Sequence, residues 1–76
     1  MTQNERIINY LDEFGSITPI DAMRDLGIMR LASRIHEVKE IGKSQGFTIT
    51  DELVKSQNRW GEPTCFKRYS IKRKEN

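Results

Sequence analysis

The sequence predicts a small α+β domain in which three helices are followed by a two-stranded antiparallel β-hairpin. Up to about residue 41, apolar residues recur at three- and four-residue spacing, which is typical of amphipathic helices. From Phe47 the period changes to two, as in half-buried strands. With 76 residues, 36% of them hydrophobic, the chain has enough apolar material for one compact core but not for two.

A first helix is expected from Gln3 to Phe14. Thr2 and Glu5 have the spacing of a capping box, in which each side chain bonds the backbone amide of the other residue. Gly15 follows as a left-handed C-cap. The inward face of this helix is expected to contain Ile7, Ile8, Leu11 and Phe14.

A second, short helix is expected to begin at Thr18 and to end at Gly27, after a short extended strand near Ser16-Thr18. Thr18 suits the N-cap, and Pro19 suits the first turn, where its missing amide proton costs nothing. Asp21 lies at the positive end of the helix dipole. The small apolar face is expected to contain Ile20 or Ala22, with Met23 and Leu26.

A third helix is expected to start between Ile28 and Arg30 and to continue at least to Ile41. The following segment, Gly42-Lys43-Ser44-Gln45-Gly46, is rich in helix breakers and predicts a connection, although the end of the helix is left open between Ile41 and Gly46. Since Gly27 makes a tight turn between the second and third helices, the pair has the pattern of a helix-turn-helix. The inward positions of the third helix are Ile28, Leu31, Ile35 and Val38.

Two strands are expected beyond the third helix. Turn formers and a proline in Ser56-Pro63 predict the loop that joins them. Cys65, in the second strand, is expected to be a small packed residue. We expect the domain to cover residues 1–72 and residues 73–76 to form a flexible basic tail. The inward strand positions are Phe47, Ile49, Tyr69 and Ile71.

Three helices followed by a hairpin is the element order of a winged helix-turn-helix, with the hairpin as the wing. The stretch from Ser16 to Ile35, together with Trp60-Gly61 and the segment 69–71, resembles a family of small winged helix-turn-helix proteins common in bacteriophages and prophages. The resemblance spans most of the chain and implies DNA binding without naming an operator. Gly42-Gln45 makes the spacer before Gly46-Phe47 longer than in that family by about one helical turn.

The net charge of +2 conceals an uneven distribution along the chain. Residues 1–26 carry two Lys/Arg against five Asp/Glu, giving −3, whereas residues 27–76 carry eleven against six, giving +5. This asymmetry indicates that one face meets an anion, although a basic tail can also be a solvated chain end.

Several functional classes are not expected. No nucleophile has a nearby base, and no glycine loop is suited to phosphates, so we expect no enzyme. One cysteine and one histidine, Cys65 and His36, predict neither a disulfide nor a metal site, and no cofactor is expected. Since we find no leader and no long apolar run, we expect no membrane association and a location in the cytoplasm of a bacterial host cell.

The polar face of the third helix is the candidate surface for the major groove. Arg30 and Arg34 lie one turn apart, and arginine pairs bidentately with guanine; the alternative is an ion pair with Asp25 or Glu37. Glu37 either accepts from a cytosine amino group or orients an arginine, and we favour the second role. The candidate DNA-binding residues of this helix are Met29, Arg30, Ser33, Arg34 and Glu37.

The wing is the second candidate surface. A cation, an amide and an aromatic side chain at the tip suit a minor groove or a sugar-phosphate backbone; alternatively, Trp60 folds back onto the hairpin. The candidate wing residues are Lys55, Asn58, Arg59, Trp60 and Lys67.

The sequence therefore predicts a double-stranded DNA-binding protein that acts by occupancy, as a transcriptional regulator or as an architectural factor in excision or replication. The alternative is a protein-interaction module that binds a host or phage protein through Met29 and Trp60. A weak homodimer is compatible with either function, since a domain this small makes few contacts.

Overall fold

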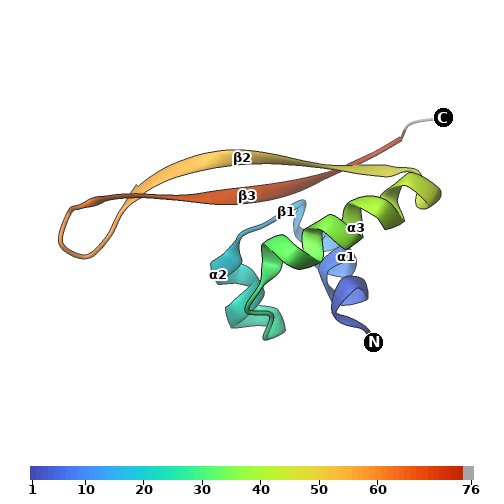
Figure 1. Cartoon of the computed structure of the whole chain (residues 1–76), viewed down its shortest axis with the longest axis horizontal. Helices are drawn as coiled ribbons and strands as arrows, with labels where there is room; N and C mark the ends of the chain where they lie inside the picture. Colours follow the sequence, from blue (N-terminus) through green and yellow to red (C-terminus); the bar gives the residue numbers. More distant parts are fainter. Residues whose placement is uncertain (75–76) are drawn as a thin grey trace.

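The computed structural model describes residues 1–74 and places the helices against one side of a long β-hairpin (Figure 1). This arrangement confirms the predicted fold class, including the short extra strand near Ser16-Thr18. The elements in chain order are α1 (Gln3–Phe14), β1 (Ser16–Ile17), α2 (Pro19–Asp21), η1 (Ala22–Leu26), α3 (Leu31–Gln45), β2 (Phe47–Gln57) and β3 (Pro63–Arg73).

The first two helices begin where their caps predict. The Thr2 hydroxyl accepts a hydrogen bond from the Glu5 amide at 3.1 Å, but within residues 1–74 the Glu5 carboxylate accepts none from the Thr2 amide, so only half of the predicted capping box forms. α1 ends at the left-handed Gly15. At α2 the capping box is complete, because the Thr18 hydroxyl accepts from the Asp21 amide and the Asp21 carboxylate accepts from the Thr18 amide. Local hydrogen bonds thus fix the start of each helix.

The second helix is less regular than predicted. A single α-helical turn, α2, passes into the π-helical turn η1, which ends at the left-handed Gly27. Ala22 is buried and Leu26 is half-buried, whereas Ile20 and Met23 are exposed, so the inward face is narrower than expected.

The third helix starts one residue later than predicted, and its end lies within the range left open between Ile41 and Gly46, so the predicted connection over Gly42-Gln45 is helical. α3 begins at Leu31, after the expected start between Ile28 and Arg30, and it continues through Gly42 to Gln45. Gly42 is buried against Phe47, so at this position the glycine permits close packing and does not end the helix. Gly46, in the left-handed conformation, ends α3 and leads directly into β2.

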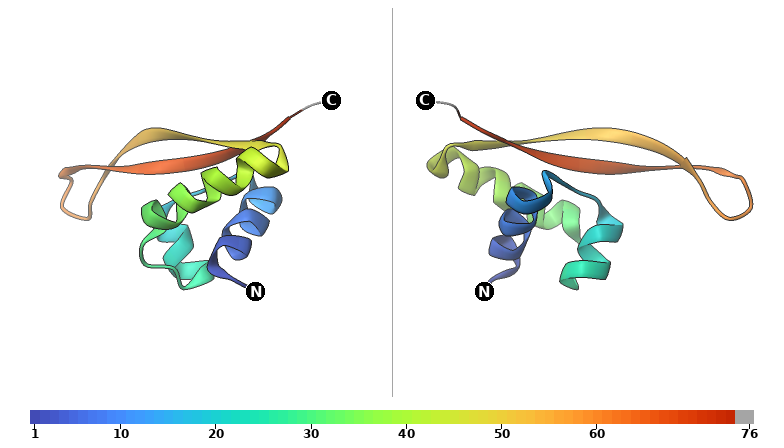
Figure 2. Two further views of the ribbon diagram at one scale, coloured as in Figure 1. Left: turned by 45° about the vertical axis from the view of Figure 1, so that its right-hand side comes forward. Right: turned by 180° about the vertical axis from the view of Figure 1, so that it is seen from behind.

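The three strands form an antiparallel sheet in the order β1-β3-β2. β2 pairs with β3 over its whole length, from Phe47 opposite Arg73 to Gln57 opposite Pro63, so residues expected in the loop belong to the strands. β1 pairs only with Tyr69 and Ser70. Beyond β1 the hairpin therefore projects as a two-stranded ribbon, which we call the distal arm (residues 52–68), past the helical body (Figure 2).

One hydrophobic core lies between the helices and the base of the hairpin. Phe14, expected inside, is 60% exposed and packs on the Tyr10 ring with centroids 4.5 Å apart. Cys65, also expected inside, is an exposed free thiol on the distal arm. The buried hydrophobic residues of this core are Ile7, Leu11, Ile17, Ala22, Ile28, Leu31, Ile35, Val38, Phe47, Ile49 and Tyr69.

The end of β3 is attached to the body. Arg73 belongs to the strand, one residue beyond the expected domain boundary, and donates three hydrogen bonds to Asp12 of α1, at 2.7, 2.8 and 3.2 Å. Its guanidinium lies 5.1 Å from the centre of the Phe47 ring. The Lys74 amide then donates to the Gly46 carbonyl at 2.9 Å, and the rest of the expected tail, residues 75–76, lies outside the described residues.

Candidate nucleic-acid interface

The orientation of α3 is set by its buried positions. Leu31, Ile35, Val38 and Gly42 face the core at helical spacing, so the residues between them face outward. Ser33, His36, Glu37 and Glu40 all belong to this exposed face. The loop before the helix adds Met29, which is 76% exposed, and Arg30, which occupies the N-cap position and not the helix itself.

Arg30 and Arg34 form a row on the side of α3 that faces α1; we call it the arginine row. Together with Met29, Gln3 and Gly27 they line an open hollow of about 280 Å³. Within the described residues, Arg30 has no acidic partner. The arginine row therefore offers one uncompensated cation and one that pairs within the protein.

Arg34 is held by Glu37, which was one of the two alternatives expected for it. Its Nη1 atom donates to Glu37 Oε2 at 3.0 Å. The same oxygen also accepts from Nδ2 of Asn4, in the first turn of α1, at 3.0 Å. The Asn4 hydrogen bond and the charge of Arg34 lower the pKa of the Glu37 carboxyl, which is therefore ionised at neutral pH.

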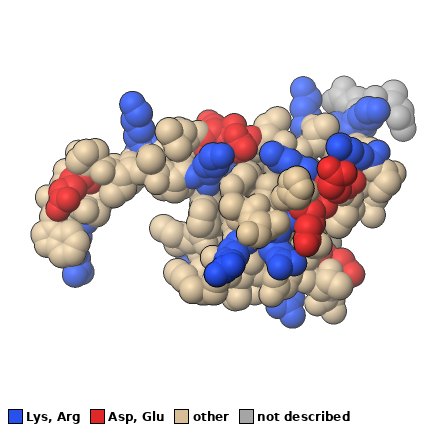
Figure 3. Space-filling view, in the orientation of Figure 1, with Lys and Arg blue, Asp and Glu red and all other residues tan. Residues whose placement is uncertain are grey.

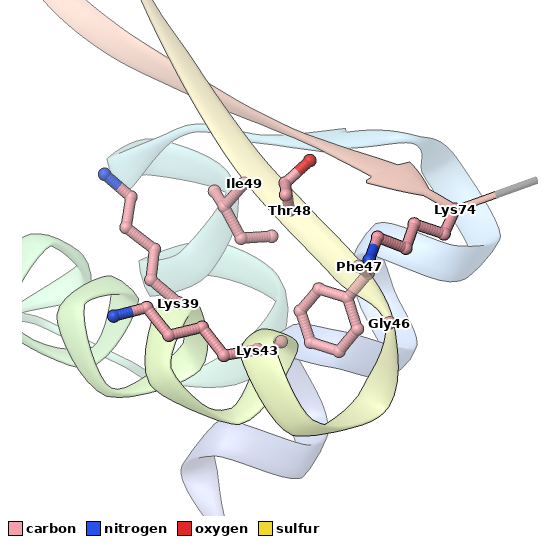
Figure 4. A pocket seen from close by; sticks show the side chains of 8 residues that line it. Lys39, Lys43, Gly46, Phe47, Thr48, Ile49 and Lys74 are labelled. Atoms are coloured by element: carbon pink, nitrogen blue, oxygen red, sulfur yellow. The ribbon is translucent and has the colours of Figure 1, made fainter.

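Lys39 and Lys43 form a second row on the side of α3 that faces β2; we call it the lysine row. With Lys74 they surround a cleft of about 420 Å³ whose floor contains Phe47 and Ile49 (Figure 4). Lys39 Nζ lies 3.8 Å from the Asp51 carboxylate, and Lys43 bonds the exposed Glu40 at 3.1 Å. Such exposed ion pairs contribute little to the stability of the fold, so an incoming anion can replace the carboxylates as the partners of these lysines.

Two basic residues of the distal arm share one face of the ribbon. The register places Lys67 opposite Leu53 and Lys55 opposite Cys65. Since facing residues of an antiparallel pair lie on the same side, these four share the face that, nearer the base, packs Phe47 and Ile49 on the helices. The opposite face carries the Glu52–Arg68 ion pair.

The loop at the tip of the arm is shaped by Asn58. Its Oδ1 accepts hydrogen bonds from the amides of Trp60 and Glu62 at 2.9 and 3.1 Å, and the left-handed Gly61 completes the turn. Trp60 is 74% exposed and does not fold back onto the hairpin; the Arg59 guanidinium lies 5.7 Å from its ring centre. Asn58 therefore builds the loop that presents Arg59 and Trp60.

Charged side chains without an oppositely charged partner occur on several elements of the described chain. Within residues 1–74, the acidic side chains of Glu5 and Glu13 on α1 and of Glu62 at the tip have no basic partner within 4.0 Å. Figure 3 shows basic side chains spread over the arm, the body and the end of β3. The basic side chains without an acidic partner in the described part of the chain are Arg6, Arg30, Lys55, Arg59, Lys67, Lys72 and Lys74.

Sequence reasoning missed the lysine row and the contact from α1. Lys39 and Lys43 have the four-residue spacing of helical neighbours, but this signal was not used because the segment from Gly42 to Gly46 was interpreted as a connection and the end of the helix was left open. No sequence signal linked Asn4 to Glu37, because the two residues belong to different helices.

Two further properties concern the part of the chain that the structure describes. In residues 1–74 no helix is long and apolar enough to cross a membrane. Over the same range, no three His, Cys, Asp or Glu side chains are grouped so as to hold a metal ion.

Comparison with known proteins agrees with this architecture. No curated protein and no solved structure matches the chain. A family model described as "Winged helix-turn-helix domain" matches residues 2–74, and domains of this family are typically DNA-binding and not enzymatic. Three helices, the turn at Gly27 and the antiparallel hairpin are the parts that this description requires. The chain therefore belongs to the winged helix-turn-helix domain family.

Proposed function

We propose that this protein binds double-stranded DNA, with α3 in the major groove and the distal arm in the adjacent minor groove. The observation that carries the proposal is the placement of basic side chains in three sets, two on α3 and one on the distal arm. The arginine row and the lysine row lie on either side of the outward face of α3, and Lys55, Lys67 and Arg59 lie on the arm.

The two rows match the surroundings of a helix in the major groove. The groove is about 12 Å wide and is bounded by two phosphate strands, so a helix that enters it has one strand on each side. In this arrangement the arginine row approaches one strand and the lysine row approaches the other. The DNA strand beside the lysine row also separates the major groove from the adjacent minor groove. The cleft lined by Lys39, Lys43 and Lys74 lies between α3 and the hairpin, where this DNA strand would pass.

The arm is long enough to reach the next groove. At about 3.4 Å per residue, the part of β2 beyond Asp51 extends roughly 20 Å from the body. Neighbouring grooves on one side of B-DNA lie about 17 Å apart, half of a helical turn of about 34–36 Å. Trp60 and Arg59 at the tip then suit contact with the groove walls or the sugar-phosphate backbone.

The biological role that we propose is occupancy of a DNA site in the cytoplasm of a bacterial host cell. The resemblance to phage and prophage proteins supports a regulator of transcription or an architectural factor in excision or replication. None of these roles requires a cofactor, since binding alone blocks or bends the DNA.

A titration of labelled random-sequence duplex, followed by fluorescence anisotropy between about 50 and 200 mM salt, tests DNA binding. Wild type should bind at the low-salt end, and its affinity should fall steeply with salt. Lys55→Gln with Lys67→Gln should reduce the slope of log affinity against log salt by about 2, one for each lost phosphate contact. Arg6→Gln is the matched control, because Arg6 is a cation on α1 without an acidic partner in residues 1–74, and it should leave the slope unchanged. No binding by wild type at low salt would rule out the proposed function.

A protein-interaction module is a second candidate function, favoured by the exposed apolar side chains. Met29 and Trp60 are exposed, and Leu53 on the arm is 62% exposed. Such side chains often anchor protein interfaces. The double variant Arg30→Ala with Arg34→Ala discriminates: it should abolish DNA binding under the first proposal and leave capture of a host protein intact under the second. Sedimentation of wild type with and without duplex tests for the weak homodimer.

A further inference from the structure

In the described part of the chain, side-chain hydrogen bonds hold Glu37 through one of its two carboxylate oxygens. Asn4 Nδ2 and Arg34 Nη1 both donate to Oε2, each at 3.0 Å. Within residues 1–74, Oε1 accepts no side-chain hydrogen bond. The side chain is half exposed on the outward face of α3, so Oε1 remains free to accept from a ligand.

The orientation of Asn4 depends on the charge of Glu37. The Asn4 Oδ1 atom is buried and has no hydrogen-bond partner among the described residues. Exchanging the amide oxygen and nitrogen would place Oδ1 against the carboxylate, where two acceptors repel each other. The amide therefore keeps Nδ2 on Glu37 although its oxygen stays unsatisfied, and α1 fixes the position of the carboxylate on α3.

A fixed carboxylate on a DNA-facing surface can accept from few groups. Phosphate oxygens repel it, and the only donors on the base edges of the major groove are the amino groups of cytosine and adenine. Carboxylates characteristically accept from cytosine N4, whereas adenine is usually paired with an amide side chain that also donates to N7. The chemistry at Oε1 thus favours cytosine.

We propose that Glu37 is a specificity-determining residue whose Oε1 accepts a hydrogen bond from the N4 amino group of a cytosine in the major groove. This inference rests on the proposed function. Asn4 and Arg34 are its positioning residues. The Nε and Nη2 atoms of Arg34 donate to no other described residue, so they remain available to a neighbouring guanine or phosphate.

The experiment begins with selection of sites from random duplexes by wild type, followed by affinity measurements on single-base variants of the selected site. Glu37→Gln should reduce the preference for cytosine at one position by roughly 5-fold or more, which is the lower end of the discrimination against a wrong base that one good contact provides. Its affinity for unselected duplex should stay equal or rise, since a negative charge is removed. Asn4→Ala keeps the Glu37 carboxylate but removes its hydrogen bond from α1. It should weaken the same preference to a smaller extent.

The matched control is Glu40→Gln, one turn further along α3, whose carboxylate pairs with Lys43 and not with α1. It should leave every base preference unchanged. If Glu37→Gln keeps the wild-type preference at each position, or if wild type binds all duplexes equally, Glu37 is only a link between α1 and α3 and the inference is wrong. In either case DNA binding itself stands, whereas failure of wild type to bind any duplex at low salt overturns both proposals. Thermal unfolding of each variant separates a loss of preference from a loss of fold.

Discussion

Gly42 of α3 and Phe47 of β2 are in closer contact than any other residue type at position 42 would allow. A β carbon on Gly42 would lie 2.5 Å from the Phe47 carbonyl oxygen and 2.9 Å from two atoms of its ring. Since the nearest atom belongs to the backbone, no change of side-chain rotamer relieves the overlap. This contact brings the end of α3 and the start of β2 together and so sets the position of the hairpin relative to the helix.

Gly42→Ala should therefore destabilise the protein, although alanine is the better helix former by about 1 kcal/mol. Overpacking of this kind typically costs about 1–3 kcal/mol, so the net free energy of unfolding should fall. Urea unfolding measures the change. Ser44→Ala, at an exposed position of the same helix, is the control and should stay within about 0.5 kcal/mol of wild type. A Gly42→Ala protein as stable as wild type would contradict the close contact.

Thr18→Ala removes the reciprocal cap at the start of α2. The Asp21 amide loses the hydroxyl that accepts from it at 3.2 Å, and the expected cost is about 1 kcal/mol in urea unfolding. Thr18→Ser keeps the hydroxyl and should restore most of the loss. Equal destabilisation by both substitutions would assign the effect to side-chain packing and not to the cap.

Asp51→Asn should strengthen binding to DNA. The substitution removes the carboxylate that faces Lys39 at 3.8 Å and leaves the lysine free for a phosphate. We expect an affinity gain of several-fold for random duplex at low salt, which should disappear in the Lys39→Gln background. Glu13→Gln changes the net charge equally and is the control, because Glu13 lies on α1 and has no basic partner among the described residues. An equal gain from both substitutions would show that only net charge matters.

Trp60 is the only tryptophan of the chain and lies at the tip of the arm, so its emission reports directly on that site. Binding of duplex should quench or shift the emission as the exposed ring leaves water. Trp60→Phe should weaken binding modestly, and removal of the ring in Trp60→Ala should weaken it more. An emission spectrum unchanged at saturating DNA would place the tip away from the duplex.

The stability of the protein should also depend on Glu37 at acidic pH. Asn4 and Arg34 hold the folded-state pKa of this carboxyl below its ordinary value, so their stabilisation is complete above the ordinary glutamate pKa. It is lost as the pH falls through the lowered folded-state pKa. Urea unfolding from about pH 7 to about pH 3 should therefore show a shallower acid loss for Glu37→Gln than for wild type. Parallel curves would indicate that the two contacts do not persist in solution.

Most of the fold could be predicted from interactions between residues that are close together in the sequence. The caps at Thr2 and Thr18 and the left-handed Gly15 and Gly27 could be predicted because cap hydrogen bonds join residues only a few positions apart. Gly42 was misread because glycine both ends helices and permits close packing, and only its contact with Phe47 decides between the two.

The rest of the structure could not be predicted, because it depends on contacts between residues that are far apart in the sequence. Ser56, Gln57 and Pro63 favour turns locally, but the hydrogen-bond ladder of β2 and β3 continues through them. At the candidate interface, the four-residue spacing of Arg30 and Arg34 was visible in the sequence. The link from Asn4 to Glu37 was not, because it depends on how α1 packs against α3.

The attachment at the base of the hairpin makes the arm behave as a lever. Arg73 bonds α1, the Lys74 amide bonds Gly46, and the Ile71 amide bonds the Gly15 carbonyl, so the strands are fixed at one end only. Over an arm of roughly 20 Å, a rotation of about 5° at the base moves the tip by about 2 Å. A displacement of that size is enough to break a hydrogen bond. The packing of Phe47 and Arg73 thus sets, from a distance, where the tip of the arm lies.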